Sequence, residues 1–230
     1  LNKITSQKIK KEAEKIRLLF TSDSLSISGI HSLILELIVK LNKKKFDCQV
    51  AVIKPLNAED AFYLNDLNER NIPVKTLGLT HPQALFPIGV KRMKKIIKEF
   101  NPQIVFTSSL PDCFFVVRAA ASMDVSIISI FNGLASIEGL SKFKRRILLD
   151  HLEFSDGIIV LSERDKKSYP REISTPIEVF SPVIDTRRFS PLSARPPSQK
   201  KEFVIGAVVT RKDSESLPLL IEVFSALHKR

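Results

Sequence analysis

Short, continuous apolar runs alternate along the chain with segments in which apolar residues recur every three or four positions. The apolar runs predict strands over residues 16–20, 47–53, 72–77, 103–107, 125–131, 157–161 and 177–180. The periodic segments predict helices over residues 31–42, 58–71, 88–100, 112–123, 142–154 and 163–168. Strands that alternate with helices and are apolar throughout are typical of the α/β class, as a Rossmann-like, doubly wound parallel sheet.

This pattern changes towards the end of the chain. A polar, proline-rich segment follows Pro191, and a fresh apolar run begins at Phe203. We therefore predict a basic lead-in over residues 1–15, a domain over 16–191, a linker over 192–202, and the start of a second Rossmann-like domain over 203–230. The second domain would contribute its first strand and helix, and we expect it to be truncated.

The sequence also predicts which strand lies at the edge of the sheet and which loops bind ligands. The strand over residues 72–77 contains Pro73, which has no N–H to donate, so we expect this strand at the sheet edge. In doubly wound sheets, ligands bind at the carboxyl ends of the strands. The loops after Phe20, Thr107, Phe131 and Leu161 are therefore predicted to form the functional rim.

Charge and cysteine content narrow the class of protein. The net charge of +11 over 230 residues favours an anionic partner: a nucleotide or phosphate ligand, a membrane surface or a nucleic acid. Cys48 and Cys113 lie far apart in apolar contexts, which predicts reduced core thiols in a cytoplasmic protein. No apolar run approaches the roughly 18–20 residues of a membrane span, and no signal peptide is visible.

Several function classes lack their motifs. The chain has no G-x-S-x-G elbow, no Walker G-x4-G-K-[ST] loop and no G-x-G-x-x-G, so hydrolase, kinase, ATPase and dinucleotide oxidoreductase functions are disfavoured. Nucleic acid is not an expected partner, because the chain has no Trp, two Tyr and no groove-reading or stacking motif. The pattern of residues identifies no catalytic side chain.

The predicted helices over residues 88–100 and 142–154 are basic. Their cationic residues are Lys91, Arg92, Lys94, Lys95, Lys98, Lys142, Lys144, Arg145 and Arg146. Such helices suit an anionic bilayer, to which each Lys or Arg contributes about 1 kcal/mol. Alternatively, their apolar faces pack on the sheet and the cations are simply solvated.

Several segments match the landmarks of one known family in order and spacing. They are Ser26–Ile30, Phe46–Val50, Asn101–Phe106, Asp124–Gly133, Ser155–Glu163, Val183–Pro191 and Ile205–Val209. Together they resemble the N-terminal domain of a retaining GT-B glycosyltransferase of family four, followed by the start of its C-terminal domain. The sequence departs from the family pattern at Asn132, where a His is usual, and it lacks a Glu-x7-Glu motif.

This resemblance implies a function. Such an enzyme moves a sugar from a nucleotide-sugar donor to a lipid-linked or polysaccharide acceptor, as in lipopolysaccharide assembly, without a metal or other cofactor. It would work in the cytoplasm, with peripheral contact at the inner face of the membrane as a further expectation. The alternative is a catalytically inactive Rossmann-like binding module or a degenerate transferase subunit. By itself, the fragment is expected to bind the donor poorly and to turn over little.

The resemblance also implies the site residues. The acceptor side and phosphate loop would comprise Ser28, Gly29, Ile30, Ser108, Ser109, Asn132 and Gly133, and the donor side Arg211 and Lys212. Gly29 precedes the first helix, where a residue without Cβ lets a phosphate approach the backbone; the same glycine also suits a plain turn. His31 could touch an anion, although a solvated helix residue is the expectation for it.

Overall fold

The computed structural model describes residues 14–26, 29–81, 86–131, 141–170, 173–182, 186, 190 and 217–228. The chain divides into two units, Leu1–Val183 and Ile184–Arg230. In the second unit, α8 (Leu217–His228) is the described helix. The linker over residues 192–202 and the strand expected from Phe203 lie outside the described residues.

The first unit alternates strands and helices along its whole length. Its strands are β1 (Ile16–Ser22), β2 (Phe46–Val52), β3 (Val74–Thr76), β4 (Ile104–Thr107), β5 (Ser126–Phe131), β6 (Gly157–Val160) and β7 (Ile177–Val179). Its helices are α1 (Gly29–Lys40), η1 (Ala58–Asp60, a 3-10 turn), α2 (Ala61–Glu69), α3 (Phe86–Phe100), α4 (Leu110–Ala120), α6 (Lys142–Glu153) and α7 (Glu163–Ser168). The elements match the predicted alternation, with ends that differ by a few residues.

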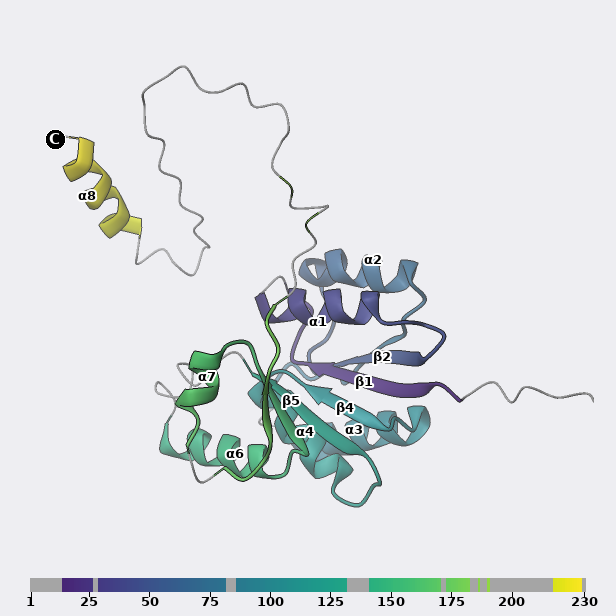
Figure 1. Ribbon diagram of the computed structural model, residues 1–230. Coiled ribbons are helices and arrows are strands. Elements are labelled where there is room, and N and C mark those ends of the chain that lie inside the picture. Colours follow the sequence, from purple (N-terminus) through teal and green to yellow (C-terminus); the bar gives the residue numbers. More distant parts are fainter. Residues whose placement is uncertain are drawn as a thin grey trace, which may run out of the picture. The chain divides into compact units, whose positions relative to one another are not determined.

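The described strands form one parallel sheet in the order β3-β2-β1-β4-β5-β6-β7. The chain starts near the middle, winds out to β3, returns to β4 beside β1 and winds out the other way to β7 (Figure 1). The doubly wound fold is thus confirmed. So is the edge position of the strand after Pro73, whose carbonyl accepts from the N–H of Val50 at 2.9 Å.

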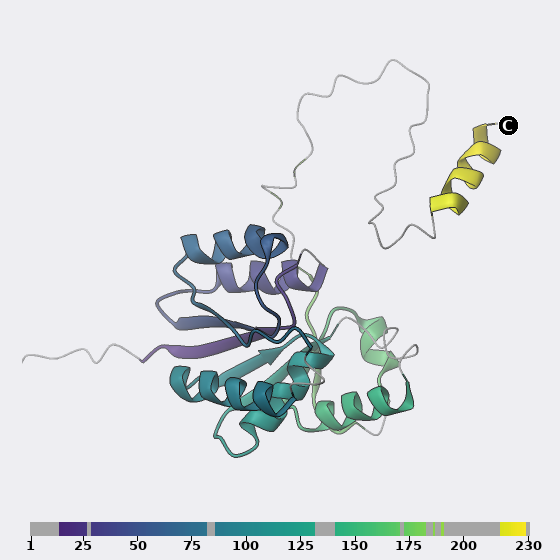
Figure 2. The same cartoon turned by 180° about the vertical axis from the view of Figure 1, so that it is seen from behind.

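Helices cover both faces of this sheet (Figures 1 and 2). On one face, α1 and α2 pack over alternate strand residues such as Leu18, Phe20 and Val50. On the other face, α3 and α4 cover Leu19 and Val105, and α6 covers the part that includes Phe131 and Ile158. Burial on both faces explains why the strand sequences are continuous apolar runs.

The layer of α3 and α4 is closely packed. A Cβ placed on Gly89 of α3 would overlap the ring of Phe115 on α4. The apolar side of α3, which includes Met93, Ile96 and Ile97, is buried in the same core. This confirms the expectation that the apolar face of this basic helix packs on the sheet.

Helix α4 begins earlier than the sequence pattern predicted. Its N-cap is Ser109, whose Oγ accepts from the N–H of Asp112, while the Asp112 carboxylate accepts from the N–H of Ser109. This reciprocal capping satisfies N–H groups that would otherwise lack partners in the first turn. Asp112 is therefore the third residue of the helix, and the predicted start at that residue was wrong.

Candidate functional site

The carboxyl ends of β1 and β4 lie side by side, because the two strands are paired in parallel from Leu18 with Ile104 to Phe20 with Phe106. The residues that follow each strand therefore meet at one edge of the sheet. Ser108 after β4 donates its hydroxyl to the carbonyl of Thr21 in β1 at 3.0 Å. The predicted rim loops after Phe20 and Thr107 are thus linked directly.

A buried carboxylate, Asp112, holds this junction together. Its Oδ2 accepts from the Thr21 hydroxyl and from the N–H of Ser108, both at 2.8 Å. Its Oδ1 accepts from the N–H and the hydroxyl of Ser109, both at 2.6 Å, and from the N–H of Cys113 at 3.0 Å. Every one of these partners donates, which is the environment that an ionised carboxylate requires.

Burial and hydrogen bonding act in opposite directions on this group. Burial raises the pKa of Asp112 to about 6, although the hydroxyl and N–H donors from Ser109, Ser108 and Thr21 oppose the rise. The carboxylate is therefore still ionised at neutral pH. Asp112 was not among the residues that the sequence pattern singled out. Its signal was the spacing Ser-x-x-Asp from Ser109, which is a capping-box pattern at the start of a helix.

His31, in the first turn of α1, is the second titratable group at this edge. Its side chain is buried, with 7 % of the residue exposed, so the expectation of a solvated helix residue was wrong. Nδ1 lies 2.7 Å from the carbonyl oxygen of Ser26, and Nε2 lies 2.8 Å from the hydroxyl of Ser22. The ring thus spans from the end of β1 to the loop that precedes α1.

Asp23 links His31 to Lys54. One carboxylate oxygen of Asp23 lies 3.6 Å from His31 Nε2, and the other lies 3.0 Å from Lys54 Nζ. These two partners, His31 first, hold the pKa of Asp23 well below its ordinary range despite partial burial. Burial by itself would lower the pKa of His31, but the nearby Asp23 carboxylate, the hydrogen bond to Ser26 and the charge of Asp112 raise it above its ordinary value.

Gly29 is the first residue of α1 and is exposed. Among the described residues, no atom lies within 4 Å of a Cβ added to it, and its φ is not in the left-handed region. Neither packing against those residues nor a special backbone conformation therefore requires glycine here. Within the described part of the chain, the backbone at Gly29 is open to a ligand.

The remaining predicted site residues divide into two groups. Ser108 and Ser109 lie at the junction described above, on the loop between β4 and α4, and Ile30 belongs to the first turn of α1. Ser28, Asn132, Gly133, Arg211 and Lys212 lie outside the described residues, so their placement stays a prediction. The structure thus brings Gly29, Ser108 and Ser109 to the carboxyl ends of the two neighbouring strands β1 and β4.

A second buried polar cluster lies under β4, β5 and α6. Ser129 Oγ lies 3.0 Å from Thr107 Oγ1, 3.0 Å from His151 Nε2 and 2.8 Å from Ser155 Oγ. His151 Nδ1 is buried without a hydrogen-bond partner. Burial lowers the pKa of His151 to about 4, so its ring is neutral. Cys113 joins this cluster through Thr107, at 3.2 Å.

Both cysteines are free thiols, as predicted. Burial raises the pKa of Cys113 well above its ordinary range and that of Cys48 to about 11, so neither is a reactive thiolate at neutral pH. Among the described residues, no group of three or more His, Cys, Asp or Glu side chains is arranged to hold a metal ion. In the same part of the chain, no helix is long and apolar enough to cross a membrane.

The family model for Glycosyltransferase Family 4 matches residues 27–188, which is more than half of the chain. The chain belongs to Glycosyltransferase Family 4. The matched range includes α1, the loop between β4 and α4, and every strand from β2 to β7. No curated protein sequence matches the chain.

Solved structures with the same fold include members of this glycosyltransferase class. One is Anabaena Alr3699/HepE in complex with UDP-glucose, at 15% identity and a TM-score of 0.61, covering 77% of this chain and 47% of HepE. Sucrose-phosphate synthase from Thermosynechococcus elongatus shares 12% identity at a TM-score of 0.58, covering 78% of this chain and 51% of its own. The lipopolysaccharide outer core galactosyltransferase WaaB shares 16% identity at a TM-score of 0.56, covering 81% and 50%. The family-four chain thus spans about half the length of these GT-B proteins.

Proposed function

We propose that this chain forms the acceptor-side part of a retaining glycosyltransferase, which moves a sugar from a nucleotide-sugar donor to a lipid-linked or polysaccharide acceptor. Family membership supports the reaction class. HepE was solved with UDP-glucose and WaaB is named a lipopolysaccharide galactosyltransferase, which supports a nucleotide-sugar donor and a glycan acceptor. Retention and the identity of the acceptor belong to the proposal.

The observation that carries this proposal is the open backbone at Gly29. The helix dipole places partial positive charge at the N-terminus of α1. An incoming diphosphate is therefore favoured at this point, and a residue without Cβ lets it approach closely. Gly29 lies in the first turn of this helix, and no atom of the described residues packs against it closely enough to explain its lack of a side chain.

The proposed reaction needs no catalytic base from the acceptor-side residues. As the nucleoside diphosphate leaves the sugar, the first turn of α1 is proposed to meet its developing negative charge. Arg211 and Lys212 stay the donor-side residues that the family resemblance implies. The departing phosphate takes the proton from the acceptor hydroxyl, so no side-chain base is needed. Ser109 and Ser108 line the neighbouring loop, and Asn132 and Gly133 are proposed to complete the acceptor contacts. We propose that no metal is required, which predicts that EDTA leaves transfer unchanged.

A transfer assay on the complete gene product that contains these residues tests the proposal. The assay offers labelled UDP-, GDP- and ADP-sugars together with a membrane lipid extract or polysaccharide, and it measures label in the acceptor. Transfer from one of these donors, with the anomeric configuration retained in the product, is the expected result. Binding of a nucleotide-sugar without transfer would instead favour the inactive binding module. The absence of both binding and transfer would overturn the proposal.

A pair of glycine variants tests the assigned position. Gly29→Ala should reduce transfer by about tenfold or more, because the new methyl group occupies the phosphate approach and a 1.4 kcal/mol loss is tenfold. It should leave the melting temperature unchanged or slightly raised, since Ala is favoured over Gly in a helix by roughly 0.5–1 kcal/mol. Gly157→Ala is the matched control, because a Cβ there also meets open space, at the start of β6. Equal transfer by both variants would contradict the assignment.

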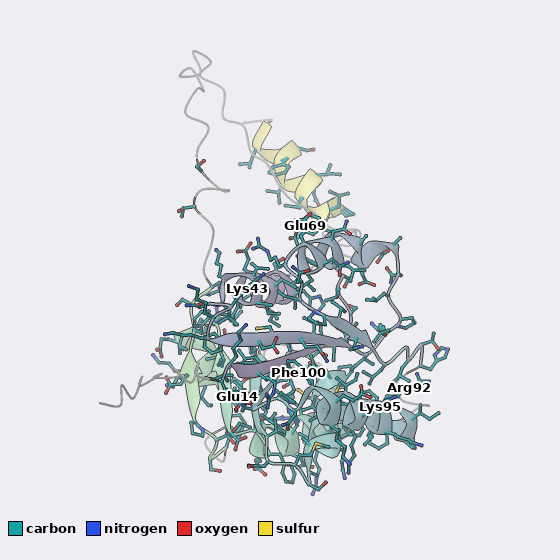
Figure 3. The ribbon with its side chains drawn as sticks, turned by 90° about the vertical axis from the view of Figure 1, so that its right-hand side faces the viewer. Glu14, Lys43, Glu69, Arg92, Lys95 and Phe100 are labelled. Carbon is teal, nitrogen blue, oxygen red and sulfur yellow. The ribbon has the colours of Figure 1, made fainter. Side chains whose placement is uncertain are left out.

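The basic side of α3 supports a further part of the proposal, contact with the inner face of an anionic membrane. Lys91, Arg92, Lys95 and Lys98 are exposed, opposite the buried Met93 and Ile97. Arg92 and Lys95 mark this basic side in Figure 3. Part of that charge is used locally, because Arg92 donates to the carbonyl of Leu77 and Lys95 lies 3.7 Å from Glu99.

Vesicle sedimentation separates membrane contact from simple solvation. Replacing Lys91 and Lys95 by Glu should weaken binding to phosphatidylglycerol vesicles by at least about tenfold, since each cation near the surface contributes about 1 kcal/mol. The control replaces Lys44 and Lys45 by Glu, which changes the net charge equally on the exposed turn before β2. If the two double variants bind the vesicles equally, the net charge of the chain and not the basic side of α3 determines binding, and this part of the proposal is wrong.

A further inference from the structure

The ring of His31 is held at both nitrogens by groups whose hydrogens can be assigned. Nδ1 lies 2.7 Å from the carbonyl oxygen of Ser26, which only accepts, so Nδ1 carries a hydrogen. Nε2 lies 2.8 Å from Ser22 Oγ, and that hydroxyl donates its own hydrogen to the carbonyl of Ser24 at 2.8 Å. With its hydrogen used in this way, the Ser22 oxygen is left as an acceptor towards Nε2.

Nε2 also faces Asp23. The nearer carboxylate oxygen lies 3.6 Å away, and it too can only accept when ionised. A bare Nε2 lone pair would therefore face an acceptor oxygen of Ser22 and a negative oxygen of Asp23 together. A hydrogen on Nε2 satisfies both, and with Nδ1 already protonated the ring becomes an imidazolium cation.

Charged groups on the neighbouring elements favour the same state. Asp112 on α4 is close enough for its charge to act on His31, as Asp23 does from the loop after β1. Asp60, at the end of η1, is engaged by the backbone instead, because it accepts from the N–H of Leu25 at 2.9 Å. Three effects oppose a cation: burial of the ring, Lys54, which shares Asp23, and the N-terminal dipole of α1 itself.

We propose that His31 is an imidazolium cation at neutral pH and acts as a positioning residue, fixing the β1–α1 connection and thereby the first turn of α1 that begins at Gly29. The ring ties Ser22 at the end of β1 to Ser26 in the loop, and Asp60 holds Leu25 from the side of η1. The protonation of the ring is inferred from these contacts and charges, and it does not depend on the proposed function. Its importance for transfer rests on the proposed function of Gly29.

The protonation state is tested by nitrogen-15 NMR titration of the imidazoles in the labelled 230-residue chain. The His31 signals are assigned by their loss in His31→Gln and, in case that variant does not fold, by elimination with His151→Leu and the spectra of His81 and His228. His31 should titrate with a midpoint above neutral pH, and so above the ordinary value of about 6.5. In Asp23→Asn the midpoint should fall. A wild-type midpoint below neutral pH would overturn the proposal.

The positioning role has its own readout. The amide signals of residues 23–26 and 29 should shift with the same midpoint as the ring, because loss of the charge releases the contacts to Ser22 and Asp23. If the ring titrates and these amides do not follow, His31 is charged but positions nothing, and the proposal fails. These measurements need no substrate, so they fail or succeed independently of the transfer assay. Where transfer is active, its kcat should fall as pH rises through that midpoint, with EDTA and donor held constant.

Discussion

Two buried histidines in this protein have opposite protonation behaviour. His31 lies in the first turn of α1 on one face of the sheet, and His151 lies in the last turn of α6 on the other. Both are almost fully buried, at 7 % and 3 % exposed, and each has Nε2 within 3.0 Å of a serine hydroxyl. Nevertheless the pKa of His31 is raised above its ordinary value, while burial lowers the pKa of His151 to about 4.

The groups beyond the serine account for the difference. Around His31, a carbonyl holds one nitrogen, and the carboxylates of Asp23 and Asp112 supply negative charge. Around His151, Ser129 is linked to Thr107 and Ser155, which are neutral, and Nδ1 has no partner. Burial therefore excludes charge only where no opposite charge is buried with it. The edge of β1 and β4 carries fixed charge, and the cluster beneath β5 is neutral.

The largest effect should come from removing the buried carboxylate of the charged cluster. Asp112→Ala leaves the N–H groups of Ser108, Ser109 and Cys113 without their acceptor and removes a charge that faces His31. We expect a loss of roughly 3–5 kcal/mol in the free energy of unfolding. Urea denaturation measures it. Ser155→Ala, in the neutral cluster, should lose only about 1 kcal/mol, and equal losses would remove the distinction between the clusters.

An intermediate effect should distinguish the two histidines themselves. His31→Leu leaves the carboxylate of Asp23 without its imidazolium and the carbonyl of Ser26 without a donor, and it should cost about 1–3 kcal/mol. His151→Leu removes a ring that has an unsatisfied nitrogen, and Ser129 keeps its partners Thr107 and Ser155. We expect that variant to stay within about 1 kcal/mol of the wild type. Thermal and urea unfolding of both variants at pH 7 provide the measurement, and the reverse order would contradict the account.

The remaining effects concern the dependence of stability on pH, and they are resolved only as differences between variants. The raised pKa of His31 gives stability that is complete below about 6.5 and is lost as pH rises through that pKa. The lowered pKa of His151 gives stability that is complete above about 6.5 and is lost as pH falls toward 4, at most about 3 kcal/mol. In the acid range Asp112 acts in the direction opposite to His151. Its raised pKa makes the free energy of unfolding fall as pH rises from about 4 to about 6.

Comparing each variant with the wild type separates the contribution of each histidine from that of Asp112. The free energy of unfolding of the wild type minus that of His151→Leu should decrease only on the acid side. The same difference for His31→Gln should decrease only on the alkaline side. Urea titrations from pH 5 to pH 9 supply both curves. If both differences decreased on the same side, the two rings would not differ in protonation.

The fold was predictable because a strand that is buried on both faces of the sheet has a continuous apolar sequence. Continuous apolar runs such as residues 157–161 cannot be half-solvated, and Pro73 restricts its strand to an edge. The boundaries were less certain. The pattern continued helix α2 through Asn71, whereas the helix ends at Glu69 and Asn71 adopts φ 55°. A local left-handed residue leaves no periodic signal in the apolar positions.

The candidate site was only partly predictable. The family resemblance pointed to Gly29, Ser108 and Ser109, which lie where β1 and β4 lead into α1 and α4, and their roles stay a prediction. Asp112 and the charge on His31 were missed, because their character depends on neighbours far away in sequence. Thr21 lies 91 positions from Asp112, and no local pattern connects them. The Ser-x-x-Asp spacing was the one local signal for Asp112.

A single nitrogen-15 spectrum of the wild-type imidazoles at pH 7 tests the central contrast most directly. Protonated and unprotonated ring nitrogens resonate in separate ranges, so the charge of each ring can be seen without a titration. The account predicts that both nitrogens of His31 carry hydrogen, whereas His151 shows one nitrogen of each kind. A neutral His31 at pH 7 would contradict the fixed charge that we assign to the carboxyl ends of β1 and β4.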